Sequence, residues 1–292
     1  MPYLTCAYCG AALARRGGSV RCGAGHVFDI ARSGYVSLLP AGAKVAGGDT
    51  AAMVQARADF LGAGHFSSLA DALGQAASSA GAAGAGAAGA GAAGCVVDVG
   101  AGTGYYLAAV LDRLSERAGL ALDISKFALR RAVRAHRRIG AVRCDVWRRL
   151  PVADSAASLA LNVFAPRNGA ELRRILSPAG RLLVVTPMPD HLGELTGPLG
   201  LLTVDPRKQE RLTEKLSPYF APVGRREHRV MLSLTQGAVS ALVAMGPSSW
   251  HADPPALAAR IGQLREPVSV TLAVALSVYQ PSAGPGHGTA RP

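Results

Sequence analysis

The sequence has few aromatic residues and no long hydrophobic run. Phe, Trp and Tyr together make up 5% of its 292 residues, so the core must be built largely from Ala, Val and Leu. It contains no run of about 18 apolar residues free of charges, which argues against a membrane-spanning helix. The opening MPYLTCAYCG has neither the basic nor the apolar segment of a secretory signal. We therefore expect a cytoplasmic protein that associates with no membrane.

Acidic residues are scarce relative to basic ones. Lys and Arg number 31 against 19 Asp and Glu, a formal net charge of +12, and nearly all of the cations are Arg. A genome rich in G and C favours Arg over Lys, but it does not explain the surplus of cations over anions. The charge favours a polyanionic partner, because the guanidinium group binds phosphate through a planar fork of donors.

Cysteine is scarce and unevenly distributed, with three of the five in the first 22 residues. Cys6 and Cys9 form a C-x2-C pair, and Cys22 and His26 form a C-x3-H pair. Three thiolates and one imidazole suit tetrahedral zinc, and four protein ligands leave no open position for catalysis. We predict a structural zinc in a small module at residues 1–40. The alternative is a set of free thiols beside a surface histidine.

Short apolar runs alternate with helical patterns from Cys95 onward. This alternation predicts an α/β, Rossmann-like domain at residues 95–280, with a parallel sheet covered on both faces. The runs RVMLSLT and SVTLAVALSVYQ fit an antiparallel finish to that sheet. Residues 41–94 are expected to form a linker, a helix and a loose Gly/Ala-rich insertion at 75–94. The tail at 281–292 is expected to be disordered.

The segment D-V-G-A-G-T-G follows an apolar strand and precedes a helix. Its first glycine permits a sharp turn, its second permits close approach of a ligand, and its third lets the helix pack tightly on the strand. Carboxylates follow three successive strands at the sheet edge where open α/β sheets bind ligands. The predicted cofactor-binding residues at this edge are Asp98, Gly100, Gly102, Thr103, Gly104, Asp123 and Asp145.

The carboxylates have distinct expected roles. Asp123 is placed to accept hydrogen bonds from both ribose hydroxyls, and Asp145 to meet an adenine amino group. The spacing is G-x-G-x-G rather than the G-x-G-x-x-G of dinucleotide enzymes, so the turn need not hold a pyrophosphate. The competing interpretation makes these residues helix caps, with Asp123 preceding the helical segment SKFAL.

Two loops and the G-D-T segment supply weak candidates for catalysis. In N-V-F-A-P-R-N, Asn162, Phe164 and Pro166 are candidates for positioning a base, and the alternative is an ordinary loop capped by Asn168. Asp49 is a candidate general base, with helix capping as the stronger competing role. The pattern offers no obvious general base, so the catalytic residues stay unassigned.

Together these motifs resemble those of a known enzyme family. The chain resembles the RlmA-type 23S rRNA (guanine-N1)-methyltransferases, and especially their actinobacterial macrolide-resistance members, the tylosin-resistance subgroup. The matching segments follow the family order from residue 6 to about residue 251. They are C-A-Y-C, R-C-G-A-G-H-V-F-D-I-A-R-S-G-Y-V-S-L-L-P, G-D-T-A-A-M-V-Q-A-R-A-D-F-L-G-A-G-H-F, D-V-G-A-G-T-G-Y-Y, L-D-I-S-K, N-V-F-A-P-R-N, T-P-M-P-D-H-L-G-E-L and V-A-M-G-P-S-S-W-H.

The resemblance implies one zinc on the four predicted ligands and S-adenosylmethionine at the glycine-rich turn. It implies that Phe66 and His191 also touch this cofactor. It further implies a homodimer that methylates guanine N1 in the domain II hairpin of 23S rRNA, at guanine 748 in rRNA numbering, and confers macrolide self-resistance. The Gly/Ala-rich tract departs from the family pattern without interrupting a motif. Two alternatives stay open: a methyltransferase for tRNA or a small molecule, and a non-catalytic zinc-containing RNA-binding protein.

Overall fold

The computed structural model describes residues 3–40, 42–43, 47–88, 94–201, 205, 207–246 and 253–282. The predicted disordered tail lies outside these residues from position 283 onward, as do residues 89–93 of the Gly/Ala-rich tract. Within the described part of the chain, no helix is long and apolar enough to cross a membrane.

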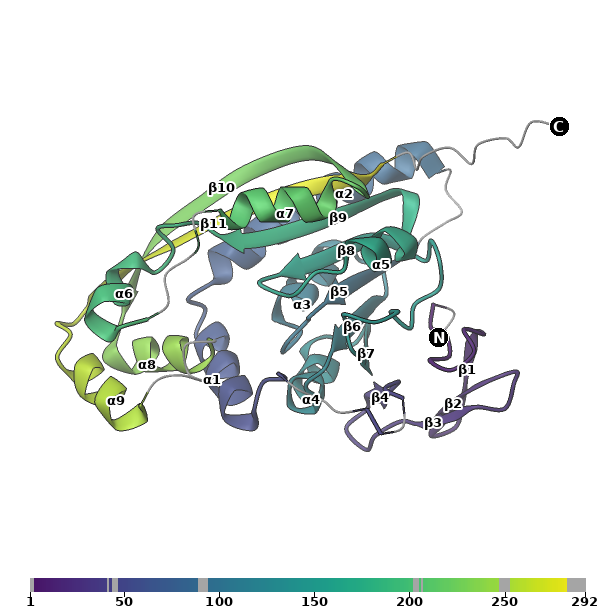
Figure 1. Cartoon of the computed structure of the whole chain (residues 1–292), viewed down its shortest axis with the longest axis horizontal. Coiled ribbons are helices and arrows are strands. Elements are labelled where there is room, and N and C mark those ends of the chain that lie inside the picture. Colours follow the sequence, from purple (N-terminus) through teal and green to yellow (C-terminus); the bar gives the residue numbers. More distant parts are fainter. Residues whose placement is uncertain are drawn as a thin grey trace.

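The chain forms a small antiparallel sheet followed by a large mixed sheet with helices packed on it (Figure 1). In order, the elements are β1 (Leu13–Arg16), β2 (Ser19–Cys22), β3 (Val27–Asp29), β4 (Val36–Ser37), α1 (Ala51–Gly62), α2 (Ser67–Ala88), β5 (Cys95–Val99), α3 (Tyr105–Arg113), β6 (Gly119–Asp123), α4 (Lys126–Ala135), β7 (Ile139–Arg143), β8 (Ala157–Val163), α5 (Gly169–Ile175), β9 (Leu176–Pro187), α6 (Gly193–Leu199), α7 (Lys208–Leu216), β10 (Phe220–Leu234), α8 (Gln236–Ala244), α9 (Pro254–Gly262) and β11 (Val268–Pro281).

The large sheet has the strand order β10-β11-β9-β8-β5-β6-β7-β4. From β9 to β4 neighbouring strands run parallel, whereas β11 is antiparallel to both β9 and β10. Every residue of β5 is buried, which is typical of a parallel strand covered on both faces. The predictions of an α/β sheet and of its antiparallel finish are confirmed.

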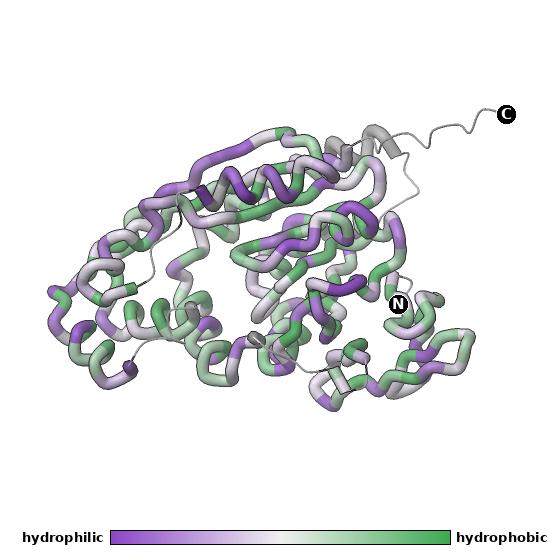
Figure 2. Tube along the Cα trace, in the orientation of Figure 1, coloured by the Kyte–Doolittle hydropathy of each residue, from purple (hydrophilic) through white to green (hydrophobic). Residues whose placement is uncertain are grey.

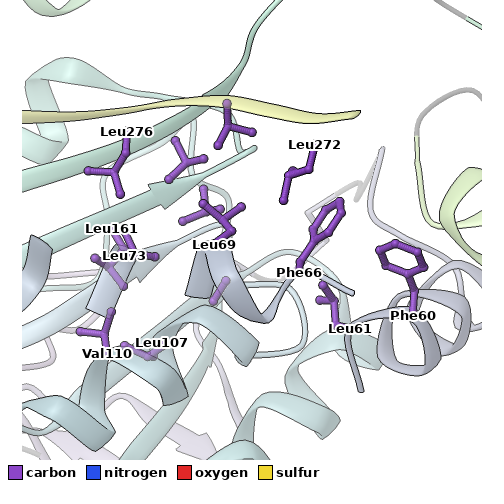
Figure 3. Close-up of a cluster of buried hydrophobic side chains, with 14 of the residues drawn as sticks. Phe60, Leu61, Phe66, Leu69, Leu73, Leu107, Val110, Leu161, Leu272 and Leu276 are labelled. Atoms are coloured by element: carbon purple, nitrogen blue, oxygen red, sulfur yellow. The ribbon is translucent and has the colours of Figure 1, made fainter. Parts of the chain in front are cut away.

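Successive residues of β5 point to opposite faces of the sheet and enter different apolar clusters. Val96 joins a cluster with residues of α2 and α3, and Val97 and Val99 join a cluster with residues of α5 and α7. Figure 3 shows the first cluster, where Leu69 of α2 lies beneath β11. Helices cover both faces of the sheet, so a ligand site must lie at an edge. Parallel strands place their carboxyl ends at one edge, and the loops there can form this site.

The N-terminal module is fused to the large sheet. Strand β4 pairs in parallel with β7, so that Val36 lies opposite Val142 (Figure 1). Leu4 forms an antiparallel bridge with Val152. Leu4 and Val20 also belong to the same apolar cluster as Val97. The module therefore packs against the large sheet and shares its apolar core.

The expectation of a loose insertion at 75–94 is wrong for residues 75–88, which continue helix α2. Leu69, Leu73, Ala77 and Ala80 recur at spacings of three or four and are buried in the same cluster. Burial of this stripe and the helix propensity of Ala outweigh the cost of each helical Gly, about 1 kcal/mol. The low-complexity tract thus begins as a packed helix, for which the sequence composition alone gave the wrong expectation.

Hydrophilic residues are concentrated on α7 and along much of β10 (Figure 2). Arg225, Arg226, Glu227 and Arg229 are exposed on β10, which is an edge strand of the large sheet. Charged side chains on an edge strand oppose pairing with a strand of another chain.

Gly104 sets how closely α3 approaches α4. Its φ is 78°, and a Cβ there lies 2.9 Å from the Cα of Ala132, so its tight contact is with α4 and not with the strand. We expect Gly104→Val to lower the free energy of unfolding by at least about 2 kcal/mol, because it adds left-handed strain and a backbone clash. Urea denaturation followed by circular dichroism measures this change.

The control is Gly62→Ala, at a helical position where the added Cβ has no atom within 4 Å. It should leave stability unchanged or raise it by up to about 1 kcal/mol. Equal losses in the two variants would contradict the role given to Gly104.

Candidate functional site

The glycine-rich turn connects β5 to α3 at the carboxyl edge of the sheet. Gly100 and Gly102 have φ values of 81° and 54°. A Cβ on Gly100 lies 2.4 Å from the Cβ of Ala165, so the loop after β8 closes directly on the turn. Gly102 is more open, since the nearest atom to such a Cβ is Nη1 of Arg57 at 3.6 Å. Close approach of a ligand to the backbone requires this openness.

Asp123, at the end of β6, holds this turn in place. Its Oδ2 accepts a hydrogen bond from the N–H of Gly102 at 2.8 Å, and its Oδ1 accepts one from Ser125 at 2.8 Å. Burial raises the pKa of Asp123 despite these two bonds. A carboxylate accepts about four hydrogen bonds, so it retains acceptor capacity for hydroxyl groups such as those of a ribose. The cap of α4 is Ser125, whose hydroxyl accepts from Ala128, and not Asp123.

Asp98 lies deeper at the same edge, on β5. It is 2% exposed, and its Oδ1 has no hydrogen-bond partner among the residues that the structure describes. Burial, and secondarily the charge of Asp123, raise the pKa of Asp98 to about 8. An unpartnered buried carboxyl group is costly for the fold. Its presence beside an open glycine turn indicates a site whose ligand supplies a donor or a positive charge.

The loops after β8 and β9 bring Phe164 and His191 together. Their rings stack with centroids 5.9 Å apart, and Phe164 meets Tyr106 edge-on at 6.5 Å. Phe164 is 41% exposed and has a φ of 52°, a strained conformation for a residue with a side chain. The ring of His191 is fixed by the N–H of Ala273, which donates to Nδ1 at 3.3 Å. This arrangement presents an aromatic face on which a nucleic-acid base can stack.

Asn162 and Asn168 shape the loop that carries Phe164. Asn162 is fully buried, and its Nδ2 donates to the carbonyls of Val99 at 3.2 Å and Pro166 at 2.8 Å. Asn162 therefore braces the loop in this structure and does not face solvent. Asn168 caps α5, because its Oδ1 accepts from the N–H of Glu171 at 3.3 Å.

Asp49 does not cap α1, so the capping interpretation is wrong. The cap is Thr50, whose hydroxyl accepts a hydrogen bond from Met53 at 3.3 Å. Asp49 instead forms an ion pair with Arg57, and Nη2 of Arg57 also donates to the carbonyl of Met245 at 2.7 Å. Sequence reasoning missed Arg57, since it stands inside a helix without a recognisable motif and no spacing rule links it to the glycine-rich turn.

Thr103, Phe66 and Asp145 occupy different surroundings. Thr103 is buried and lines a cavity of about 550 Å³ between α1, α2, α3 and α4. Phe66 is 2% exposed in the apolar core, as Figure 3 shows, so its contact with a cofactor stays a prediction. Asp145 lies two residues beyond the end of β7, with Oδ1 accepting from the N–H of Trp147 at 3.0 Å. Its contact with an adenine likewise stays a prediction.

The four predicted metal ligands converge in the N-terminal module. Their ligand atoms all lie within 4.8 Å of one another. The Sγ atoms of Cys9 and Cys22 are 3.7 Å apart, and Nδ1 of His26 lies 3.6 Å from Sγ of Cys6 and 3.4 Å from Sγ of Cys22. A zinc with bonds of about 2.3 Å to sulfur and about 2.0 Å to nitrogen requires tetrahedral edges of about 3.5–3.8 Å. The residues therefore fit a zinc ion.

The surroundings of Cys22 favour the thiolate that such a metal needs. Burial opposes ionisation of the thiol, but hydrogen bonds from the backbone and ring of His26 and from Cys9 outweigh it and lower the pKa of Cys22 to about 6. Cys95 and Cys144 contrast with it, because burial raises the pKa of both thiols. Both are buried core residues.

The strand order and the glycine-rich turn with buried carboxylates beside it define a Rossmann-like class I methyltransferase domain, here fused to a zinc-ribbon module. A family model described as the N-terminal zinc ribbon of RlmA matches residues 4–46.

Comparison with curated proteins identifies the family. The chain is 51% identical over 290 residues to a putative 23S rRNA (guanine-N(1)-)-methyltransferase of Micromonospora griseorubida, covering 96% of this chain and 98% of that protein. It is 50% identical over 280 residues to the 23S rRNA (guanine(748)-N(1))-methyltransferase of Streptomyces fradiae, with coverage of 96% and 97%. A Bacillus subtilis relative, YxjB, is 29% identical over 261 residues and is covered to 87%. The chain belongs to the family of RlmA-type 23S rRNA (guanine-N1)-methyltransferases.

The metal site generates a prediction on zinc content. We expect Cys22→Ser to reduce bound zinc from about one ion per chain to near zero, since it removes one of four ligands. It should also lower the melting temperature of the whole chain, because Cys22 belongs to the apolar cluster that contains Val97. Zinc released by denaturation is measured with a chromophoric chelator. Cys144→Ala is the control and should retain zinc; full zinc content in Cys22→Ser would refute the site.

The buried carboxyl of Asp98 generates a prediction on pH. Its folded pKa of about 8 lies above the ordinary value of 3.8, so the folded state holds the proton more tightly. Relative to Asp98→Asn, the wild type should therefore be most stable below pH 4 and should lose stability up to pH 8, by as much as about 1.4 kcal/mol per pH unit. Urea titrations of both proteins from pH 5 to pH 9 measure the difference. A stability difference independent of pH would contradict the buried, unpartnered state of Asp98.

Proposed function

We propose that this chain transfers the methyl group of S-adenosylmethionine to N1 of a guanine in the domain II hairpin of 23S rRNA, at position 748 in rRNA numbering. The observation that carries the proposal is the turn of Gly102 bound to Asp123 beside Asp98, whose Oδ1 has no partner in the described part of the chain. The chain is 50% identical to the Streptomyces fradiae enzyme named for that guanine. The identity covers 97% of that enzyme, so its whole catalytic unit has a counterpart here.

The residues at the sheet edge fit S-adenosylmethionine. Gly102 leaves its backbone open to a ligand, and Asp123 can accept further hydrogen bonds from the ribose hydroxyls. The buried Oδ1 of Asp98 can accept a hydrogen bond from a donor of the ligand. When bound, this cofactor supplies a methyl group whose bond to sulfur breaks as the bond to guanine N1 forms, leaving a thioether while N1 gives up its proton. The protein contributes position and orientation, which is the larger part of such catalysis.

Guanine N1 lies on the Watson–Crick edge, so the target base must be unpaired or flipped out of its helix. The exposed ring of Phe164, stacked on His191, is placed to hold such a base by its face. Phe164 has a strained backbone and a partly exposed ring, and Asn162 fixes its loop through Pro166. No side chain is assigned as the general base.

The N-terminal module carries features of an RNA-binding surface. Tyr8 is 51% exposed and stacks on Phe28 with ring centroids 5.7 Å apart. Arg15, Arg16 and Arg21 are exposed on β1 and β2 beside it. Aromatic faces and guanidinium groups together bind the bases and phosphates of single-stranded RNA. We propose that a structural zinc maintains this surface.

We further propose that the enzyme works as a cytoplasmic homodimer and confers macrolide self-resistance. The support is the match of N-V-F-A-P-R-N and the G-P-S-S-W-H segment to the resistance subgroup, together with the guanine named for the Streptomyces fradiae relative. The second of these segments lies outside the described residues.

Methyl transfer from labelled S-adenosylmethionine to unmodified 23S rRNA tests the proposal. We expect incorporation and a primer-extension stop at the domain II hairpin guanine, since N1 methylation blocks base pairing. Asp123→Ala should reduce the initial rate at least about tenfold, and the control Asp154→Asn, at an exposed carboxylate, should not.

Other outcomes separate the alternatives. Transfer to tRNA alone would refute the ribosomal assignment in favour of a tRNA methyltransferase. Binding of S-adenosylmethionine and RNA without any transfer would refute an enzymatic role.

A further inference from the structure

Arg57 lies over the glycine-rich turn, although none of the roles assigned above uses it. A Cβ on Gly102 lies 3.6 Å from Nη1 of Arg57 and 3.8 Å from its Cδ, so the guanidinium stem passes directly above the backbone that a ligand must approach. Arg57 projects from α1, an element outside the strands and turns that form the rest of the site. It therefore adds a cation from a separate element to the turn that Asp123 holds.

The guanidinium of Arg57 is held by two contacts and keeps N–H donors for a further partner. It forms an ion pair with Asp49 through Nη1, and Nη2 donates to the carbonyl of Met245 at 2.7 Å. These bonds use two of its five N–H groups, as far as the described residues show. The Arg57 side chain is 25% exposed, which leaves it accessible to a small ligand while water is largely excluded.

The backbone that carries Asp49 is itself fixed to the cofactor edge. The hydroxyl of Ser125, the residue whose N–H binds Asp123, donates to the carbonyl of Asp49 at 2.8 Å. The ion pair, the carboxylate of Asp123 and the N–H of Gly102 therefore form one continuous set of contacts. The position of Arg57 relative to the turn is set by hydrogen bonds and not by a flexible side chain alone.

The charges at this edge are unevenly matched. Asp98 and Asp123 both lie at the turn, and Asp49 adds a third carboxylate beside them. Arg57 is the cation that the described residues place beside the Gly102 turn, so it is the group there that can pair with an anionic group of a ligand. The methionine end of S-adenosylmethionine carries an α-carboxylate and an α-ammonium group. The ammonium suits the carboxylates, and the α-carboxylate requires a cation.

We propose that Arg57 binds the α-carboxylate of S-adenosylmethionine and that Asp49 orients the guanidinium for this contact. The inference rests on the proposed function, because it takes the cofactor to be bound at the turn of Gly102. An RNA phosphate is the other anion that a guanidinium binds. The limited exposure of Arg57 and its place above the turn favour the smaller ligand, since phosphate contacts need a side chain that reaches an open surface.

Equilibrium binding to two cofactor analogues tests this assignment. Decarboxylated S-adenosylmethionine retains the adenosine, the sulfonium and the amine and lacks only the α-carboxylate. We expect Arg57→Gln to weaken binding of S-adenosylmethionine at least about tenfold, the effect of losing a charge-assisted hydrogen bond. The same substitution should change the affinity for the decarboxylated analogue less than about twofold. Isothermal titration calorimetry on the full-length protein measures both.

Two further variants protect the test against indirect effects. Asp49→Asn combined with Arg57→Gln removes the carboxylate that the single substitution leaves unpaired, and should show the same selective loss. Arg131→Gln removes a different contact between α4 and α1, the hydrogen bond to Gln55, and should bind both compounds as the wild type does. Circular dichroism confirms that each variant is folded.

Equal weakening of both compounds in Arg57→Gln and in the double variant would overturn the inference, because Arg57 then supports the turn without recognising the carboxylate. Unchanged cofactor binding with weaker binding of 23S rRNA would overturn it in favour of a phosphate contact. If the wild type bound neither compound, the cofactor assignment itself would fail, and the inference with it.

Discussion

The hydrogen bond from the N–H of Gly102 to the carboxylate of Asp123 is the interaction on which the site depends. It joins the turn after β5 to the end of β6, two strands that are neighbours in the sheet. The same carboxylate accepts from Ser125, which caps α4 and whose hydroxyl binds the carbonyl of Asp49. Asp123 thus holds the turn directly, and through Ser125 it is connected to α4 and to the segment before α1. A carboxylate is suited to this role because it accepts several hydrogen bonds at once.

The buried polar residues around that contact have different roles. Asn162 spends its donors on the carbonyls of Val99 and Pro166 and thereby shapes the loop. Asp98 keeps one acceptor, Oδ1, without a partner among the residues that the structure describes, and burial raises its pKa. Stable domains seldom retain such a group, whereas binding sites do, because the ligand completes the hydrogen bonding. Asn162, on the adjacent strand, also keeps a buried oxygen, Oδ1, without a partner among the described residues, but its amide donors hold the loop in place.

Much of the fold was predictable from the sequence because its signals are local. The apolar strands with helices between them, the glycine-rich turn and the two zinc-ligand pairs all depend on residues close together in the chain. The contacts that the sequence did not predict join segments that are distant in the chain. Arg57 meets Gly102 only because α1 folds back over the sheet edge, and the pairing of β4 with β7 links positions more than a hundred residues apart. The Gly/Ala tract was wrongly predicted to be loose for another reason. Its helix is stabilised by buried residues that begin at Leu69, before the tract.

The fusion of the zinc module to the sheet has a geometrical consequence. Strand β4 extends the same parallel ladder whose other strands carry Asp98 and Asp123, and Leu4 is bridged to Val152. The module and the strands that carry the reactive edge are therefore joined through one continuous sheet. Under the proposed function, an RNA hairpin bound at the module presents its other end at a set distance. The enzyme then selects its nucleotide by the distance along the folded RNA between the bound end and the reactive edge. Recognition of the neighbouring bases contributes little to this selection.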